Sequence, residues 1–183
     1  QTYNKWELII IDNFSSNSPD KLINKFKDER IKFYKFDNKN NIARARNYGI
    51  EKSNYHWIAF LDADDVWKKN KIEKVKQIIE KQNSDFVYHG MYYLPKKFGF
   101  IDHKIKDQSK EISKPIYETL IKEGNAIANS SVVVKKKILE EINFLSEDNK
   151  KFSWEDYDCW IRCSKKTDSF SYIPTILGYC WIG

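Results

Sequence analysis

The sequence contains little cysteine and no long apolar segment. Its three cysteines, Cys159, Cys163 and Cys180, are odd in number, and no histidine pair lies near the first two to complete a zinc site. This pattern argues against a disulfide framework and a structural zinc site, so we interpret the cysteines as reduced structural thiols. No apolar run approaches the roughly 20 residues that span a bilayer, and the first seven residues do not resemble a signal peptide. We therefore expect a soluble, cytoplasmic protein.

Internal repeats and low-complexity segments are also absent. The chain has 183 residues, of which 41% are hydrophobic and 15% aromatic. This composition is sufficient for one globular domain with a sizeable core, and we expect no second domain.

Basic residues outnumber acidic ones, 32 to 26, which gives a net charge of +6. Lysines cluster in 68–76 and 135–137. Such a surplus can attract nucleic acid, an anionic membrane or phosphorylated substrates, but acidic residues are interspersed here. Without a nucleic-acid-binding motif we expect no nucleic-acid partner. We interpret these lysines as solvated surface residues. Peripheral contact of the lysines with an anionic membrane is the alternative.

Three carboxylates follow directly on a short apolar run. Residues 57–61 read as a buried strand, and Asp62, Asp64 and Asp65 come immediately after it. Carboxylates this close repel one another unless a cation or a donor-rich ligand neutralises them, and Mg²⁺ or Mn²⁺ is the simplest candidate. A solvated acidic turn that caps the next helix is the alternative.

Apolar strands and amphipathic helices alternate in the first half of the chain. Strand patterns cover 6–11, 31–36, 57–61 and 85–93, and helical patterns cover 21–27, 42–51 and 70–82. This alternation predicts right-handed crossovers and a largely parallel sheet. Asp12 and Asn13 follow the first strand, so we expect them at the same sheet edge as Asp62.

Two arginines, Arg44 and Arg46, lie in the first turns of the predicted helix 42–51. Cations are unfavourable there because of the helix dipole, which suggests an anion nearby. Two exposed arginines on a surface helix are the alternative.

The second half of the chain begins with a polar, lysine-rich segment at 95–114, which we interpret as a mobile or functional loop. Helices are predicted at 115–122 and 135–142, and a short strand at 131–134. Residues 169–181 have a strand-like pattern that we expect to be broken at Pro174.

The segment WEDYDCWIRC, residues 154–163, has helical apolar spacing. Its predicted apolar stripe consists of Trp154, Tyr157, Trp160 and Ile161. Glu155 is expected on another side of the helix, and Asp158 and Arg162 are expected to form a surface ion pair. Asp156 has no such partner, and it is either a helix cap or a partly desolvated general base.

Five segments resemble motifs of one enzyme family in their order and spacing. They are QTYNKWELIIIDN, NNIARARNYGI, YHWIAFLDADDVWKKNKIEK, NSSVVVKKKILEEINF and WEDYDCWIRC. Together they resemble the family 2 glycosyltransferases of the GT-A fold. The resemblance implies an α/β fold with a Rossmann-like, mostly parallel sheet flanked by helices, and an inverting sugar transfer from a nucleotide-sugar donor. It also implies a donor-binding half, 1–93, and an acceptor-binding and catalytic-base half, 94–183.

The resemblance implies roles for four donor-binding residues. Asp12 and Asn13 fall where the family contacts the base and ribose of the nucleotide. Arg46 falls in the family's A-R-N motif, near the nucleotide. Asp62 is the first acid of the D-x-D motif and is expected towards the ribose. We expect a UDP-sugar as the donor.

The resemblance further implies a metal ligand and a catalytic base. Asp64 is the second acid of the D-x-D motif and would bind the Mn²⁺ or Mg²⁺ that bridges the diphosphate. Asp156 matches the acid of the family's E-D pair, which is the catalytic base. The implied acceptor is a glycan or a lipid-linked glycan in bacterial cell-surface assembly, at the inner face of the membrane.

The chain departs from the family pattern at its start. Family members begin with a further strand that lies centrally in the sheet, whereas this sequence starts at Gln1, in the segment after that strand. We therefore expect that strand to be missing from this sequence and an apolar sheet edge to be exposed.

Two other functional classes were compared with this interpretation. Haloacid-dehalogenase phosphatases also carry a D-x-D motif, but they require threonine or valine at the position of Asp65, so this class is disfavoured. A non-catalytic module that binds nucleotide sugars or an anionic surface is kept as the alternative. The joint presence of Asp62, Asp64 and Asp156 argues against it.

Overall fold

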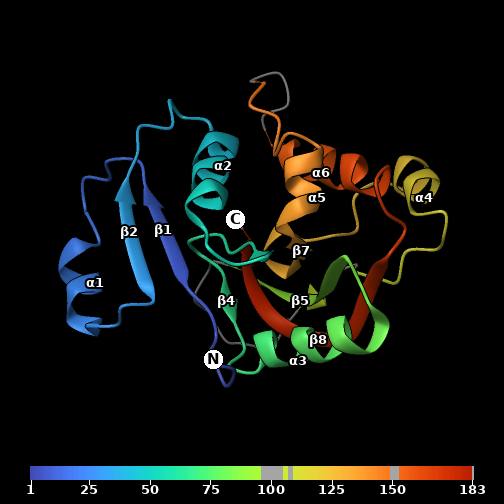
Figure 1. Cartoon of the computed structure of the whole chain (residues 1–183), viewed down its shortest axis with the longest axis horizontal. Helices are drawn as coiled ribbons and strands as arrows, with labels where there is room; N and C mark the ends of the chain where they lie inside the picture. The colour runs from blue at the N-terminus through green and yellow to red at the C-terminus, as the bar shows by residue number, and fades with distance from the viewer. Residues whose placement is uncertain (96–104, 107–108, 149–152, 183) are drawn as a thin grey trace.

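The computed structural model describes residues 1–95, 105–106, 109–148 and 153–182 (Figure 1). The strands are β1 (Leu8–Asp12), β2 (Ile31–Lys35), β3 (Trp57–Ala59), β4 (Val66–Trp67), β5 (Phe86–Pro95), β6 (Ile105–Lys106), β7 (Val133–Lys135) and β8 (Phe170–Ile182). The helices are α1 (Asp20–Phe26), α2 (Ile42–Lys52), α3 (Lys71–Gln82), α4 (Ile116–Glu123), the 3-10 turn η1 (Asn129–Ser131), α5 (Lys136–Glu141) and α6 (Glu155–Ser164). The helices and long strands predicted from periodicity are present, with ends shifted by a few residues.

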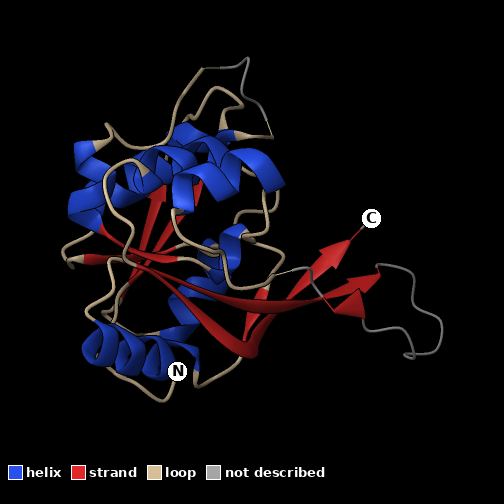
Figure 2. Cartoon of the chain, turned by 90° about the vertical axis from the view of Figure 1, so that its right-hand side faces the viewer, coloured by secondary structure: helices blue, strands red, loops and turns tan. Residues whose placement is uncertain are grey.

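A six-stranded sheet forms the centre of the fold. Its order is β3-β7-β5-β8-β4, and β6 pairs with β5. The longest pairing joins β5 and β8, which run parallel from Phe86 opposite Phe170 to Pro95 opposite Ile182. Helix α3 covers one face of this sheet, and α4, α5 and α6 cover the other (Figures 1 and 2).

The strand pairing is more mixed than the predicted, largely parallel sheet. Strand β7 lies antiparallel between β3 and β5, and β4 is antiparallel to β8. The β5–β8 and β1–β2 pairs are parallel. Apolar periodicity identifies a strand but contains no information about its neighbours, so it did not predict the insertion of the short β7.

Strands β1 and β2 form a parallel pair of their own, flanked by α1 and α2 (Figure 1). Within the described ranges, β1 is hydrogen-bonded to β2 alone and β3 to β7 alone. Asp12 and Asp62 were expected at one common sheet edge. The structure instead places them after strands of two different sheets, because β1 and β3 are not paired with each other.

The core has two layers, one on each face of the larger sheet. Phe86 and Val87 are both fully buried, and as successive strand residues they face opposite layers. The Phe86 ring stacks on Phe170 with centroids 4.1 Å apart and meets the edge of Trp160 at 5.1 Å. Val87 belongs to the other layer, with Val75 of α3. The aromatic layer therefore holds α6 against the sheet.

Helix α6 packs three of the four residues of the predicted stripe into the core, since Tyr157 and Ile161 lie beside Trp160 in the same cluster. Trp160 is fully buried as expected, but Trp154, at the N-cap, is 62% exposed. Glu155 was expected on another side of the helix and is instead only 8% exposed. Residues 155, 159 and 163 lie on one helical face, and Cys159 and Cys163 are buried.

Several smaller predictions are confirmed. All three cysteines are free and buried. Asp158 and Arg162 form the predicted ion pair at 2.8 Å, although the pair is half-buried, and Arg162 also donates to the carbonyl oxygens of Ile142 and Phe144. The functional loop predicted at 95–114 lies largely outside the described residues. Within the described part of the chain, no helix has the length and apolar character needed to cross a membrane.

Candidate functional site

The three carboxylates after β3 lie in a tight turn, which we call the acidic loop (residues 62–65). The backbone N–H of Asp65 donates to the carbonyl of Asp62 at 3.0 Å and closes the turn. The turn η1 holds its first residue, because Asn129 Nδ2 donates to Asp62 Oδ1 at 2.9 Å and the N–H of Asp62 donates to Ser130 Oγ at 2.9 Å. The acidic loop therefore has a defined conformation.

The second and third carboxylates of the loop differ in environment. Asp64 is exposed. Asp65 is half-buried, and burial raises its pKa; the charges of Asp62 and Asp64 add to the rise, and hydrogen bonds from Ser130 and Cys180 oppose it. The alternative that these acids cap the next helix is wrong, because β4 intervenes and α3 begins only at Lys71.

Arg46 links the acidic loop to α6. Its Nη2 lies 2.8 Å from Asp62 Oδ1 and its Nη1 lies 2.7 Å from Glu155 Oε1, with the side chain 12% exposed. Burial lowers the pKa of Arg46, but the two carboxylates raise it by more, so the guanidinium stays charged. We expected an anion near Arg46 because a cation is unfavourable at a helix N-terminus, and the carboxylates of Asp62 and Glu155 are that anion. The alternative that Arg46 is an exposed surface residue is wrong.

Asp156 lies beside this ion-pair cluster, in the first turn of α6. Burial raises the pKa of its carboxyl group, and the nearby charges of Glu155 and Asp62 add to the rise. The N–H of Tyr157 and the charge of Arg46 act in the opposite direction without cancelling it. The net rise makes Asp156 a stronger base than an ordinary surface aspartate.

Asp12 and Asn13 lie at the carboxyl end of β1. Asp12 is 6% exposed; its Oδ1 accepts from the N–H of Ser15 at 3.2 Å, and its Oδ2 is buried without a hydrogen-bond partner within the part of the chain that the structure describes. Asn13 is exposed and accepts from the N–H of Asn38. A buried acceptor oxygen without a donor is available to a ligand that supplies an N–H or O–H group.

Comparison with known proteins identifies the family. The model of Glycosyl transferase family 2 matches residues 1–142. The chain belongs to this family. The match covers β1, α2 and the acidic loop of this family 2 chain, and ends before α6.

Two relatives from Escherichia coli are similar over most of the chain. The UDP-Glc:alpha-D-GlcNAc-diphosphoundecaprenol beta-1,3-glucosyltransferase WfgD is 30% identical over 165 residues, which are 90% of this chain and 60% of the relative. The enzyme of the same description called WfaP is 32% identical over 166 residues, 91% of this chain and 61% of the relative. The family 2 chain thus spans about 60% of the length of these curated relatives.

Among solved structures, S. aureus TarS 1–349 in complex with UDP superposes with a TM-score of 0.77 at 17% identity. The superposition covers 100% of this chain and 53% of that one. It confirms the predicted α/β fold of the GT-A type.

Two polar residues of this site were not predicted from the sequence. Glu155 is the buried partner of Arg46, and its Oε2 has no hydrogen-bond partner among the described residues. Glu155 lies four residues before Cys159 and eight before Cys163, which places the three on one helical face. This spacing could have indicated that Glu155 is buried. Asn47 of the A-R-N motif is also buried, and it bonds in both directions with the backbone of Leu145. It fixes α2 against the segment that leads towards α6.

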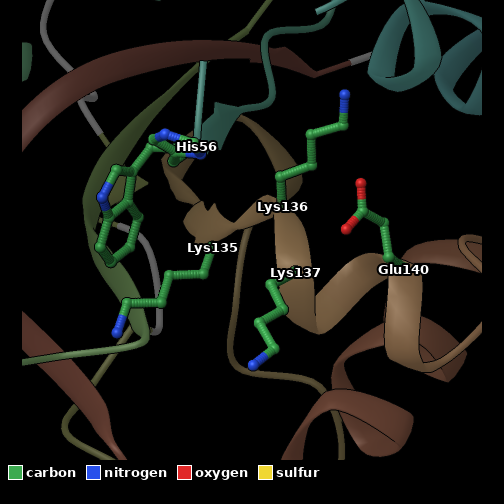
Figure 3. Close-up of a pocket in the computed structure, with 6 residues that line it drawn as sticks. His56, Lys135, Lys136, Lys137 and Glu140 are labelled. Carbon is green, nitrogen blue, oxygen red and sulfur yellow. The ribbon is translucent and has the colours of Figure 1, made fainter. Parts of the chain in front are cut away.

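A separate pocket of about 370 Å³ lies near the amino end of β3 (Figure 3). Its lining residues are His56, Trp57, Lys135, Lys136, Lys137 and Glu140. The three lysine side chains point in different directions; Lys135 pairs with Asp85, and Lys136 donates to the carbonyl of Ser53 at 2.9 Å. This pocket contains none of the predicted site residues, so we do not assign it to the donor.

Proposed function

We propose that the protein transfers a sugar from a nucleoside-diphosphate donor, a UDP-sugar, to an acceptor hydroxyl with inversion at the anomeric carbon. The proposal rests on the two ion pairs that Arg46 makes with Asp62 and Glu155. They bring the acidic loop and the first turn of α6 to one place, so a donor held at the loop would lie beside Asp156. The UDP-dependent descriptions of WfgD and WfaP, and the UDP complex of TarS, support the choice of donor.

The donor would be held by residues of the first half of the chain, 1–93. The unpartnered Oδ2 of Asp12 suits an N–H of the base, and the exposed Asn13 can donate or accept. Asp62 would accept from the ribose. Both terminal nitrogens of Arg46 are already bonded to carboxylates, so we assign it the neutralisation of Asp62 and Glu155 rather than a direct contact with the nucleotide.

Asp64 is our candidate ligand for Mn²⁺ or Mg²⁺. Within the described residues, no group of three or more His, Cys, Asp or Glu side chains is placed to hold a metal ion. The exposed Asp64 therefore fits a metal shared with the diphosphate, since Mg²⁺ is commonly bound by one or two carboxylates and substrate phosphates. Such an ion supplies Lewis-acid stabilisation of the charge that develops on the leaving diphosphate.

Asp156, in the half 94–183, would act as the general base. The acceptor hydroxyl oxygen forms a bond to the anomeric carbon as the bond from that carbon to the diphosphate oxygen breaks. The hydroxyl proton passes to the carboxylate of Asp156, which its environment makes more basic. Arg46, bonded to the neighbouring Glu155, would keep Asp156 in position.

We further propose that the acceptor is a glycan or a lipid-linked glycan, met in the cytoplasm at the inner face of the membrane. The diphosphoundecaprenol acceptor in the names of two relatives supports this class. The net charge of +6 favours contact with an anionic surface.

A transfer assay tests the proposal. The protein would be incubated with Mn²⁺, UDP-glucose or UDP-N-acetylglucosamine, and a lipid-diphosphate-linked GlcNAc acceptor. Asp156→Asn should lower turnover by about 100-fold or more, the scale of general-base catalysis, while UDP binding stays unchanged. Asp158→Asn, in the same helical turn, is the control and should remain active. Donor binding without transfer to any glycan acceptor would favour a non-catalytic binding module instead.

A further inference from the structure

One buried residue, Ser130, bonds to both ends of the segment that contains the acidic loop. Ser130 is 1% exposed and lies in the turn η1. Its Oγ accepts from the N–H of Asp62 at 2.9 Å, and its carbonyl oxygen accepts from Trp67 Nε1 at 2.7 Å. Residues 62–67 are thus held at their first and last positions by a single serine.

A buried lysine completes this arrangement. Lys71 is 0% exposed; its Nζ lies 3.3 Å from the carbonyl oxygen of Ser130 and 3.4 Å from the centroid of the Trp67 ring. A carbonyl oxygen has two lone pairs, so it can accept from Trp67 and Lys71 together. Burial lowers the pKa of Lys71 well below its ordinary value. Lys71 supports Ser130 through this geometry, because its amino group donates to the carbonyl oxygen in either protonation state.

We infer that Ser130 is a positioning residue for the donor site, because its hydrogen bonds fix the conformation in which Asp62 and Asp64 meet the diphosphate and its metal. This inference rests on the proposed function. The carboxylates of the acidic loop repel one another, so without anchors the loop would open and separate Asp62 from Asp64. Asn129, from the same turn, holds the Asp62 carboxylate itself. Ser130 acts through the loop and need not touch the substrate.

The neighbouring serine provides a matched control. Ser131 is also buried, at 0% exposure, and its Oγ donates to the carbonyl of Ala128 at 2.7 Å within the same turn. Ser130→Ala and Ser131→Ala therefore each remove one buried hydroxyl group, and both groups belong to the same turn, η1. Of the two hydroxyls, the one on Ser130 is bonded to the acidic loop.

The test compares the UDP affinity of both variants in Mn²⁺ by calorimetry, alongside their melting temperatures. We expect similar small decreases in melting temperature. UDP affinity should fall by about ten-fold or more in Ser130→Ala, the scale of losing the hydroxyl's hydrogen bonds with Asp62 and Asp65, and by less than about two-fold in Ser131→Ala. A purely structural role would lower both melting temperatures and leave the two UDP affinities alike.

The outcomes separate the inference from the proposed function. If wild-type protein does not bind UDP, both are overturned. If wild type binds UDP and Ser130→Ala binds it as well as Ser131→Ala does, the inference alone is overturned. If Ser130→Ala does not fold, the UDP affinity of Trp67→Phe tests the inference instead. This substitution keeps an aromatic ring beside Lys71 but removes the 2.7 Å hydrogen bond to the carbonyl oxygen of Ser130. Reduced UDP affinity in Trp67→Phe supports the inference, and unchanged affinity contradicts it.

Discussion

The guanidinium of Arg46 lies 2.7 Å from the carboxylate of Glu155, although 109 residues separate them in the sequence. The same guanidinium binds Asp62. A single cation therefore pairs with one carboxylate from the first half of the chain and one from the second. Because the cluster is largely buried, its loss should affect both stability and the site.

We expect Arg46→Met to destabilise the protein by about 3 kcal/mol. The substitution keeps an apolar stem but leaves Glu155 buried without a counter-charge, and breaking a buried ion pair typically costs this much. Urea denaturation followed by circular dichroism gives the free energy of unfolding. Arg44→Met is the matched control, since the 3.7 Å pair of Arg44 with Glu147 is half-exposed and its loss should cost under about 1 kcal/mol. Equal losses in the two variants would contradict the bridging role of Arg46.

The rate of sugar transfer should depend on the ionisation of Asp156. A base must be deprotonated to accept a proton, and the environment raises the pKa of Asp156 above its ordinary value of 3.8. The acidic limb of the kcat–pH profile should therefore lie above pH 3.8 and disappear from the residual activity of Asp156→Asn. An acidic limb at or below this value in the wild type would argue against Asp156 as the base.

The same raised pKa affects stability, with a defined sign. A carboxyl group whose pKa is raised by folding contributes stability when protonated, and that contribution is lost as the pH rises through the folded-state pKa. Asp156→Asn should thus become progressively more stable than the wild type as the pH rises from about 4 towards 7. Urea denaturation across this range provides the measurement.

Asp85 provides a control of opposite sign. Burial raises its pKa, but hydrogen bonds from Lys135 and Thr167 lower it by more, so the net shift is downward. Its contribution to stability is present above the ordinary carboxyl pKa and is lost on acidification. Asp85→Asn should therefore lose stability relative to the wild type as the pH rises towards the ordinary carboxyl pKa of 3.8, and the difference should stay nearly constant from there to pH 7. Parallel pH dependences in the two variants would contradict the assigned shifts.

Asp64→Asn should weaken the binding of UDP when Mn²⁺ is present, because the exposed carboxylate is the proposed metal ligand. Because the described residues contain no group of three or more metal-ligating side chains, the metal should bind mainly together with the diphosphate. UDP affinity measured in EDTA should be similar for the variant and the wild type. Wild-type UDP affinity that is the same in EDTA and in Mn²⁺ would refute the metal assignment.

The sequence was sufficient to predict most helices and strands and the α/β fold, because each element has its own apolar period. Trp57–Ala59 and Phe86–Pro95 are strands in the structure, as their apolar runs indicated. The order of the strands was not predictable in this way. Whether β7 or β1 lies beside β3 depends on pairing between segments that are distant in the sequence. The apolar pattern of one segment contains no information about that pairing.

The site residues divide in the same way. The D-x-D and E-D motifs direct attention to Asp62, Asp64 and Asp156, although helix capping could explain the same residue types. The ion pair between Arg46 and Glu155 was not predicted, because it joins α2 to α6 across the fold. Sequence patterns indicate which chemical groups are present, whereas their pairing depends on how the layers pack.

The parallel pairing of β5 with β8 has a consequence for how the chain folds. Phe86 and Phe170 stack across this pairing, yet the described helices α4, α5 and α6 all lie between their strands in the sequence. Such non-local contacts require a large loop to close before they add stability, which slows folding. During synthesis β5 is made before β8, so the edge of β5 that pairs with β8 stays unpaired until β8 is present. We therefore expect slow refolding, and aggregation through the unpaired edge of β5 until β8 is present.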